Sequence, residues 1–322
     1  MPPAMAPPEI RGPGPDGPRQ GNILVIRGGA LGDFILTLPV LAALRASFPG
    51  NRIEVLGYPN VAALALASGA ADTARNIEAR PLAGFFARGG DLDPELAAYF
   101  GKFHIILSYL FDPDLIFQTN VSRVSRAGFL QGPHRPDEAS DTHASEQLLR
   151  PLERLAVFDA DPVPRIRGRA ADASRNGPLA VHPGSGSERK NWPESRWAAL
   201  LESLAQTEGS RFLLVGGEAE GDRLDRLAAG LPRGAAEVLR SRPLPEVASH
   251  LAACRGFLGH DSGITHLAAA LGLPGLILWG PSRVRTWRPR CDRMEVLEAG
   301  DQLERLAAGP VAARIRALLP GW

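Results

Sequence analysis

The sequence has few of the features that mark secreted, membrane or nucleic-acid-binding proteins. It contains only two cysteines, Cys254 and Cys291, and this excludes a disulfide scaffold and fits a reducing cytoplasm. No apolar run reaches the roughly 18 residues that a membrane span requires. The formal net charge is +1, so no excess of positive charge draws the chain to nucleic acid. We therefore expect a cytoplasmic protein that binds no nucleic acid.

The first 20 residues lack the apolar segment of a signal peptide. They read MPPAMAPPEIRGPGPDGPRQ, and this Pro- and Gly-rich composition predicts a disordered tail over residues 1–20. In the whole chain 44% of residues are hydrophobic and 22% are charged. That profile is typical of a globular protein, and 322 residues suffice for two domains.

From residue 21 onward, apolar runs of strand length alternate with segments of helical periodicity. The first unit of this pattern is NILVIRGGALGDFILTLPVLAALRASFPG, an apolar run followed by a glycine loop and an amphipathic helix. The alternation occupies residues 21–160, stops in a Pro-, Arg- and Gly-rich stretch at 161–177, and resumes over 178–322. The pattern predicts an α/β fold of two Rossmann-like domains, each with a doubly wound parallel sheet, joined by a linker. The last helix is free to pack back on the N-terminal domain.

The stretch HDSGITH contains the residue types of a hydrolytic triad in Asp261, Ser262 and His266. Ser262 and His266 share a helix face, but Asp261 precedes the helix as its expected N-cap and so cannot lie behind the imidazole. The Gly-x-Ser-x-Gly elbow is also missing. A strand end, small residues and a helix start instead form a phosphate-binding turn. A purely structural alternative, in which Asp261 caps the helix and His266 fills the core, stays open.

Three other glycine-bearing loops follow predicted strands. In RGGALGDF a turn with Gly28, Gly29 and Gly32 ends at Asp33. This carboxylate is either a helix cap or a base that takes a proton from a hydroxyl nucleophile. The glycine spacing is not that of a dinucleotide fingerprint.

The second and third loops supply groups suited to a nucleoside diphosphate. HPGSGSERKNWP offers hydroxyls at Ser185 and Ser187 and the charge of Lys190, which suit a diphosphate. VGGEAEGDR places Glu218 where a carboxylate can accept both ribose hydroxyls. Alternatively, the former is a solvated loop and Glu218 stabilises a helix dipole.

Two further patterns concern charge and metals. Five arginines at 283, 285, 288, 290 and 293 form either a solvated loop or a contact for an anionic group. No carboxylate or histidine cluster has metal-ligand spacing. We therefore expect no metal site and no bound cofactor.

Together these loops resemble those of glycosyltransferase family 9, the ADP-heptose:lipopolysaccharide heptosyltransferases. The matching stretches are ILVIRGGALGDFILTLPVLAALRASFP, VHPGSGSERKNWPESRWAALL, FLLVGGEAEGDR and GHDSGITHLAAALGLPGLILWGPS. The resemblance implies a GT-B fold, in which two Rossmann-like domains face a cleft, with the acceptor on the N-terminal domain and the nucleotide sugar on the C-terminal one. It also implies inverting, metal-independent transfer from a nucleotide-diphospho-sugar, with ADP-heptose favoured. The acceptor would be a saccharide or a glycolipid resembling the lipopolysaccharide core, with peripheral contact to the inner membrane's cytoplasmic face.

The same resemblance implies a role for each motif residue. The catalytic base falls on Asp33, next to an acceptor-side loop with Gly28, Gly29 and Gly32. The ribose ligand falls on Glu218, with Glu220 as the alternative. The donor and phosphate ligands fall on Ser185, Ser187, Lys190, Asp261, Ser262, Gly263, Thr265 and His266. The family commonly has serines before its aspartate where this chain has Gly28, Gly29 and Ala30, so the acceptor stays open.

Two other functions are compatible with a GT-B-like nucleotide-sugar site. One is a sugar-nucleotide epimerase, which needs no separate acceptor. The other is a non-catalytic nucleotide-sugar-binding module. The glycine-carboxylate loop at Asp33 favours a transferase over both.

Overall fold

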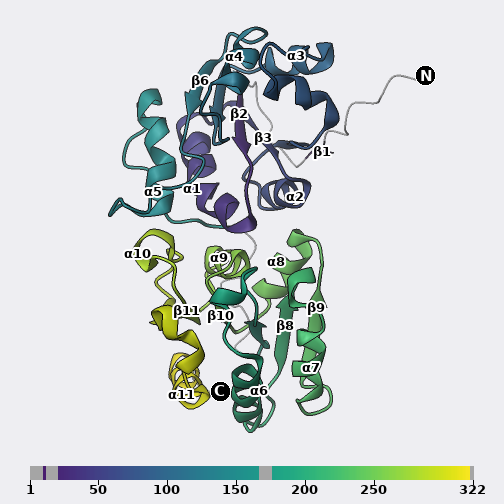
Figure 1. The fold of residues 1–322 in the computed structure, drawn as a ribbon, viewed down its shortest axis with the longest axis vertical. Helices are drawn as coiled ribbons and strands as arrows, with labels where there is room; N and C mark the ends of the chain where they lie inside the picture. Colours follow the sequence, from purple (N-terminus) through teal and green to yellow (C-terminus); the bar gives the residue numbers. More distant parts are fainter. Residues whose placement is uncertain (1–9, 12–20, 167–175, 320–322) are drawn as a thin grey trace, which may run out of the picture. The chain divides into compact units, whose positions relative to one another are not determined.

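The chain forms two compact units, each built around its own sheet. In this computed structural model the described residues are 10–11, 21–166 and 176–319. The first unit runs to Asp137 and includes Ala144–Pro162, and the second consists of Glu138–His143 and the chain from Val163. Figure 1 draws the first in purple to teal and the second mainly in teal to yellow. Most of the predicted tail and residues 167–175 of the predicted linker lie outside the described residues.

The first unit has a six-stranded sheet with the order β1-β4-β3-β2-β5-β6. All strand pairs are parallel except that of β1 with β4. The strands are β1 (Ile10–Arg11), β2 (Gly21–Arg27), β3 (Asn51–Gly57), β4 (Thr73–Asn76), β5 (Ile105–Ser108) and β6 (Gly128–Gln131). The short strand β1 lies inside the stretch that the sequence predicts to be disordered. At the centre, residues 23–26 of β2 are buried, as expected of a parallel strand covered on both faces.

Helices of the first unit follow its strands, as the alternating pattern predicts. They are α1 (Leu31–Ser47), α2 (Pro59–Ala67), η1 (Arg80–Phe86), α3 (Pro94–Phe100), α4 (Ile116–Ser122), α5 (Ala144–Leu149) and η2 (Arg150–Leu155). The periodicity of ASEQLLRPLERLAV, residues 144–157, predicts one amphipathic helix, but this segment divides into α5 and the 3-10 helix η2. Pro151 explains the division, because it has no N–H to continue an α-helical ladder.

The second unit has a fully parallel sheet with the order β12-β11-β10-β7-β8-β9. Counted from β7, this is the Rossmann order 3-2-1-4-5-6 in reverse direction. The strands are β7 (Leu179–His182), β8 (Phe212–Gly216), β9 (Ala236–Arg240), β10 (Gly256–His260), β11 (Gly275–Trp279) and β12 (Met294–Glu298). Its helices are η3 (Glu188–Lys190), α6 (Glu194–Ala205), η4 (Glu218–Glu220), α7 (Arg223–Ala229), α8 (Leu244–Ala252), α9 (Gly263–Ala270), α10 (Val284–Trp287), η5 (Gly300–Arg305) and α11 (Ala308–Leu318).

The last helix packs within the second unit, which corrects the alternative that it returns to the N-terminal domain. Val311, Ala312 and Ile315 of α11 are buried in the second unit's core, and the helix lies against α6 and β11. These apolar residues form one helical face, and that face is covered by its own sheet. The sequence predicts that the closing helical stretch is interrupted near Gly309 and Pro310, and η5 does end at Arg305 before α11 begins at Ala308. Pro310 lies in the first turn of α11, where its missing N–H is not needed.

Each sheet reverses its direction of winding next to its first parallel strand. In the second unit β7 lies between β8 and β10, and in the first unit β2 lies between β3 and β5. Open α/β sheets bind their ligands beyond the carboxyl ends of the strands at this point. The loops after β7, β10 and β2 are three of the four that the sequence singles out. None of the described helices is long and apolar enough to cross a membrane.

Candidate active site

The loop after β7, residues 183–192 and called here the β7 loop, carries three predicted site residues. Ser185 and Lys190 are half-buried and Ser187 is exposed. The Ser185 hydroxyl lies 2.9 Å from the Ser187 carbonyl oxygen and 2.7 Å from Asn191 Oδ1. Ser185, whose side chain the sequence predicts to contact phosphate, thus makes hydrogen bonds within the loop.

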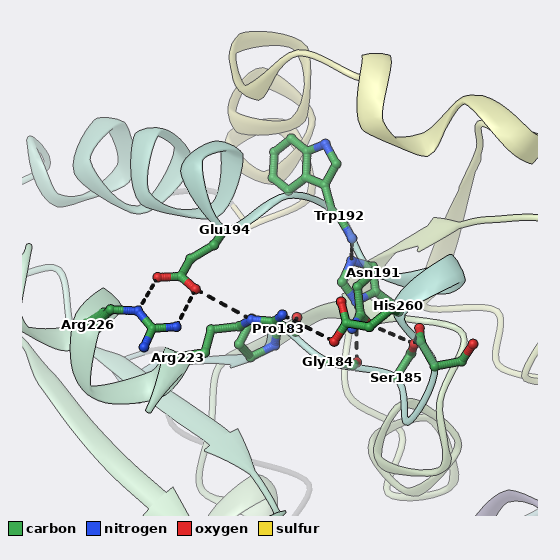
Figure 2. A network of polar contacts seen from close by, with 11 residues as sticks. Pro183, Gly184, Ser185, Asn191, Trp192, Glu194, Arg223, Arg226 and His260 are labelled. Atoms are coloured by element: carbon green, nitrogen blue, oxygen red, sulfur yellow. Dashed lines mark hydrogen bonds and ion pairs between the residues drawn. The ribbon is translucent and has the colours of Figure 1, made fainter. Parts of the chain in front are cut away.

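Two side chains, the half-buried Arg223 and the buried His260, hold the β7 loop from neighbouring elements, as Figure 2 shows. Arg223 of α7 donates to the Pro183 carbonyl oxygen at 3.3 Å and pairs with Glu188 at 3.5 Å. His260, the last residue of β10, accepts from the Trp192 N–H at 2.9 Å. Neither Arg223 nor His260 was singled out from the sequence, because a lone arginine or strand-end histidine has no motif.

Behind Arg223, Glu194 and Arg226 form a two-point ion pair with distances of 2.7 and 2.8 Å. The hydrogen bonds from Arg226 hold the pKa of Glu194 below its ordinary value. Glu194 also lies 3.7 Å from Arg223 Nε. This exposed network, drawn in Figure 2, connects α6 to α7 beside the β7 loop.

The carboxylate of Asp261 joins three loops of the second unit. Its Oδ2 accepts from Lys190 Nζ at 2.6 Å and also from the Ser282 hydroxyl. Lys190 lies on the β7 loop, Asp261 follows β10, and Ser282 follows β11. Ser282 was missed from the sequence, although it lies in the last family-like stretch. At a switch point, a half-exposed lysine that is held by a buried acid can bind an anion through its positive charge.

Ser262 caps helix α9, and this corrects the expectation that Asp261 does so. The Ser262 hydroxyl accepts from the Thr265 N–H at 3.2 Å, and Ser262 has the extended backbone of an N-cap. Asp261 lies one residue before the N-cap position, and its carboxylate forms an ion pair with Lys190. Thr265 is fully buried and donates its hydroxyl to the His260 carbonyl, so its side chain has a structural partner. Gly263 begins the helix, and His266 is buried in its first turn.

Of the two candidate ribose ligands, Glu220 lies against the β7 loop. Its Oε2 accepts from the Gly217 N–H at 2.6 Å, and it is buried, whereas Glu218 is exposed. A Cβ added to Gly184 would lie 1.8 Å from Glu220 Oε1. Glycine at this position therefore allows the carboxylate to approach the loop backbone, and Glu220 is the buried one of the two acids.

Asp33 lies in the first turn of α1, after the glycine loop of the first unit. Its Oδ2 accepts from the Ala30 N–H at 3.0 Å, and its Oδ1 lies 3.4 Å from the guanidinium of Arg27. Arg27 is 2% exposed, while the Asp33 side chain is 31% exposed. A held but accessible carboxylate of this kind can receive a proton from a hydroxyl group.

The three glycines expected on the acceptor side lie around Asp33. Gly29 has φ +96°, and a Cβ there would lie 2.7 Å from Asp33 Oδ2. Gly29 is therefore required by both its backbone conformation and the closeness of the carboxylate. Gly28 is half-buried beside it, and Gly32 is the second residue of α1.

Arg27 is held in place by groups of the first unit. It donates to the His134 carbonyl oxygen at 2.9 Å, and its guanidinium lies 5.5 Å from the Tyr109 ring centroid. Burial lowers the pKa of Arg27 and raises that of Tyr109. The Tyr109 hydroxyl donates to the Leu148 carbonyl oxygen at 2.5 Å. The contacts that hold Arg27 beside Asp33 thus continue through Tyr109 to Leu148 of α5.

Part of the arginine cluster has a structural role. Arg283 and Arg285 each lie 3.2 Å from Asp141 Oδ1. His143 Nε2 lies 2.8 Å from the carbonyl oxygen of Arg288. Through these contacts, residues 138–143 belong to the second unit. Across the described part of the chain, no group of three or more His, Cys, Asp or Glu residues could hold a metal ion.

Comparison with known proteins agrees with this geometry. Residues 156–306 match the family "Glycosyltransferase family 9 (heptosyltransferase)". Lipopolysaccharide heptosyltransferase 1 of Pseudomonas aeruginosa is 29% identical over 294 residues, which cover 81% of this chain and 79% of that protein.

Solved structures extend the likeness to both units. A family 9 glycosyltransferase of Veillonella parvula has a TM-score of 0.76 at 19% identity, covering 94% of this chain and 98% of that one. The E. coli ADP-heptose lps heptosyltransferase II has a TM-score of 0.74 at 19% identity, covering 92% and 98%. These likenesses confirm the predicted GT-B fold class.

The fold and the family match define the chain as a glycosyltransferase. The match of residues 156–306 to glycosyltransferase family 9, the heptosyltransferase family, agrees with the resemblance that the motifs predicted.

Proposed function

We propose that this glycosyltransferase moves heptose from ADP-heptose to a saccharide of a lipopolysaccharide-core-like glycolipid, with inversion and without a metal ion. The observation that carries the proposal is the Lys190–Asp261 pair beside the serine-bearing β7 loop, at the switch point of a Rossmann-like sheet. A nucleoside diphosphate suits this set of groups, because a lysine, hydroxyls and helix-terminal N–H groups all bind phosphate. The relatives' names support heptose as the sugar.

Each group of the second unit has a proposed task. Lys190, Ser185 and Ser187 bind the diphosphate, and Glu220 accepts the ribose hydroxyls. Asp261, Ser262 and the first turn of α9, with Gly263, Thr265 and His266, form the wall next to the sugar. Lys190 and the N-terminus of α9 balance the charge that develops on the leaving diphosphate, the task that a metal ion performs in other transferases.

Asp33 is the proposed catalytic base. The acceptor hydroxyl oxygen attacks the anomeric carbon of the donor sugar and forms the new glycosidic bond. Its proton passes to the Asp33 carboxylate, and the bond from the anomeric carbon to the diphosphate oxygen breaks, with both electrons leaving on ADP. A single displacement of this kind inverts the anomeric centre. Because lipid-linked acceptors lie at a membrane, we place the enzyme in the cytoplasm, in peripheral contact with the inner membrane.

A binding panel followed by an assay tests this function. We expect ADP and ADP-heptose to raise the melting temperature, through linkage, more than UDP, GDP or CMP and their sugar conjugates do. With a heptose-accepting glycolipid, ADP release should equal the glycoside formed, and EDTA should leave the rate unchanged. Stabilisation by another nucleotide alone would contradict the donor assignment. Conversion of the donor without transfer would point to an epimerase, and binding without turnover to a binding module.

A further inference from the structure

His260 makes hydrogen bonds to both ends of the β7 loop. Its Nε2 accepts from the Trp192 N–H at 2.9 Å, and its Nδ1 lies 3.3 Å from the Gly184 carbonyl oxygen. Figure 2 shows the imidazole between these two residues, which are eight positions apart in the sequence. The stretch between them contains Ser185, Ser187 and Lys190.

These partners determine the protonation state of the ring. A backbone N–H can only donate and a carbonyl oxygen can only accept, so the proton is on Nδ1 and the lone pair on Nε2. Burial lowers the pKa of His260 to about 3, and this effect outweighs the hydrogen bond to the Gly184 carbonyl oxygen, which raises it. Neighbouring His182 and Arg223 also lower this pKa, and Asp261 raises it. The imidazole is therefore neutral at physiological pH, and it is a donor at one nitrogen and an acceptor at the other.

The His260 ring both packs in the core and satisfies buried hydrogen-bonding groups of the β7 loop. It is fully buried and lies edge-to-face on Trp197, with 5.2 Å between the ring centroids. An apolar side chain of similar size could keep this packing, but it would leave the Trp192 N–H and the Gly184 carbonyl buried without a partner. His260 also precedes Asp261, and its own carbonyl accepts from Thr265. One residue thus connects the β7 loop to the start of α9.

We infer that His260 is a positioning residue that holds the β7 loop in the shape that binds the donor diphosphate. The inference rests on the proposed function for the identity of the ligand. His260 touches the loop backbone and not the reacting atoms, so it acts through Ser185, Ser187 and Lys190. Its removal should weaken donor binding and leave turnover at saturating donor nearly unchanged.

Three substitutions separate the two hydrogen bonds. His260→Phe removes both and keeps an aromatic ring. His260→Gln keeps an acceptor near the position of Nε2, and His260→Asn keeps a donor near that of Nδ1. Ile315→Val is the control, because it loosens the core that contains both Ile315 of α11 and Trp192, but it removes no hydrogen bond of the β7 loop.

The first measurement needs no nucleotide. Hydrogen exchange of the peptide that contains residues 183–192 should be faster in His260→Phe than in the wild type, with His260→Gln and His260→Asn between them. The Ile315→Val control should leave this peptide unchanged. Equal exchange in His260→Phe and the wild type would overturn the inference. If His260→Phe does not fold, the two amide variants give the same comparison against the wild type.

The second measurement is calorimetric titration with ADP, combined with steady-state kinetics. We expect about tenfold weaker ADP binding and a correspondingly higher KM for the donor in His260→Phe, the cost of roughly one lost hydrogen bond. The amide variants should recover part of this loss, with kcat changed less than KM. A fall in kcat alone, or an equal effect of Ile315→Val, would overturn the positioning role. Failure of the wild type to bind ADP would instead overturn the proposed function, and the exchange measurement would still decide whether His260 holds the loop.

Discussion

Lys190 Nζ and Asp261 Oδ2 lie 2.6 Å apart, although the two residues are 71 positions apart in the sequence. The parallel pairing of β7 with β10 brings their loops together. A diphosphate that binds here meets the lysine charge beside a buried carboxylate. The ion pair therefore presents Lys190 at a defined position before the donor arrives.

Removing the lysine should weaken ADP binding. In Lys190→Ala the charge-assisted contact is lost, and the carboxylate of Asp261 is left uncompensated near the phosphates. We expect a loss of about 1.5–3 kcal/mol, or roughly 10- to 150-fold in Kd, by calorimetry. Arg189→Ala, which removes the exposed neighbouring cation, is the matched control and should change Kd little. An unchanged Kd in Lys190→Ala would rule out the diphosphate role.

The choice between Glu220 and Glu218 can be tested with the ribose itself. The wild type should prefer ADP over its 2′,3′-dideoxy analogue, because the buried Glu220 carboxylate accepts from the hydroxyls. Glu220→Gln keeps an acceptor for Gly217 but loses the charge, so this preference should fall about tenfold, since hydrogen bonds to charged groups are the stronger ones. Glu218→Gln should keep the wild-type preference. The opposite pattern would return the ribose role to Glu218.

Gly184 should not tolerate a side chain. In Gly184→Ala the new Cβ would overlap Glu220 Oε1, and the displacement should cost about 1–3 kcal/mol of stability and weaken ADP binding. Gly217→Ala is the control, since the nearest atom to its Cβ would be Glu220 Oε2 at 3.8 Å. Chemical denaturation of both variants measures the difference. Equal stability of the two would show that Glu220 does not pack against the loop as described.

The burial of His260 predicts an acid-sensitive stability. The folded-state pKa of His260 is about 3, and the pKa of unfolded histidine is about 6.5. The unfolded chain therefore binds the extra proton between these values, and stability falls as the pH drops below about 6.5. At pH 5 this residue alone accounts for a loss of about 2 kcal/mol. Burial also lowers the pKa of His182, which acts in the same direction.

Urea denaturation of the wild type and His260→Gln at pH 7 and pH 5 measures this effect. The glutamine does not titrate, so the stability advantage of the wild type should shrink by about 2 kcal/mol at the lower pH. His182 is present in both proteins and cancels in the comparison. If the free energies of unfolding of the two proteins differ by the same amount at pH 7 and pH 5, His260 can take up a proton in the folded state.

The sequence was sufficient to predict the two parallel sheets and the loops at their strand ends. Hydrophobic runs followed by glycine, as around β2 and β8, indicate both the strand and the direction of the next helix. The predicted residues Lys190 and Asp261 do meet, because loops at one switch point share one sheet edge. These features depend on local pattern and on general topology.

What the sequence could not predict depends on tertiary partners. Asp261 and Ser262 are both good helix caps, and only the position of Lys190 determines that Asp261 is taken up by an ion pair. Glu218 and Glu220 differ by two residues in a loose register, and burial alone separates them. His260 and Arg223 act through backbone carbonyls and amides, which leave no trace in residue spacing.

The proposed transfer depends above all on Asp33 as the base, and Asp33→Asn removes that function. Asparagine keeps an oxygen to accept from the Ala30 N–H, so the loop should survive, but it cannot take the acceptor's proton. Asp93→Asn is the control, since Asp93 is a helix-capping acid of the same unit, with its Oδ1 3.0 Å from the Leu96 N–H. It should keep wild-type activity.

The deciding measurement is single-turnover transfer from ADP-heptose with Asp33→Asn, alongside its ADP affinity. If Asp33 is the base, the ADP Kd of Asp33→Asn should be close to that of the wild type, and its transfer rate should be lower by about 10²- to 10⁴-fold, the usual contribution of a general base. Transfer at the wild-type rate, or loss of ADP binding in step with loss of transfer, would contradict this role of Asp33.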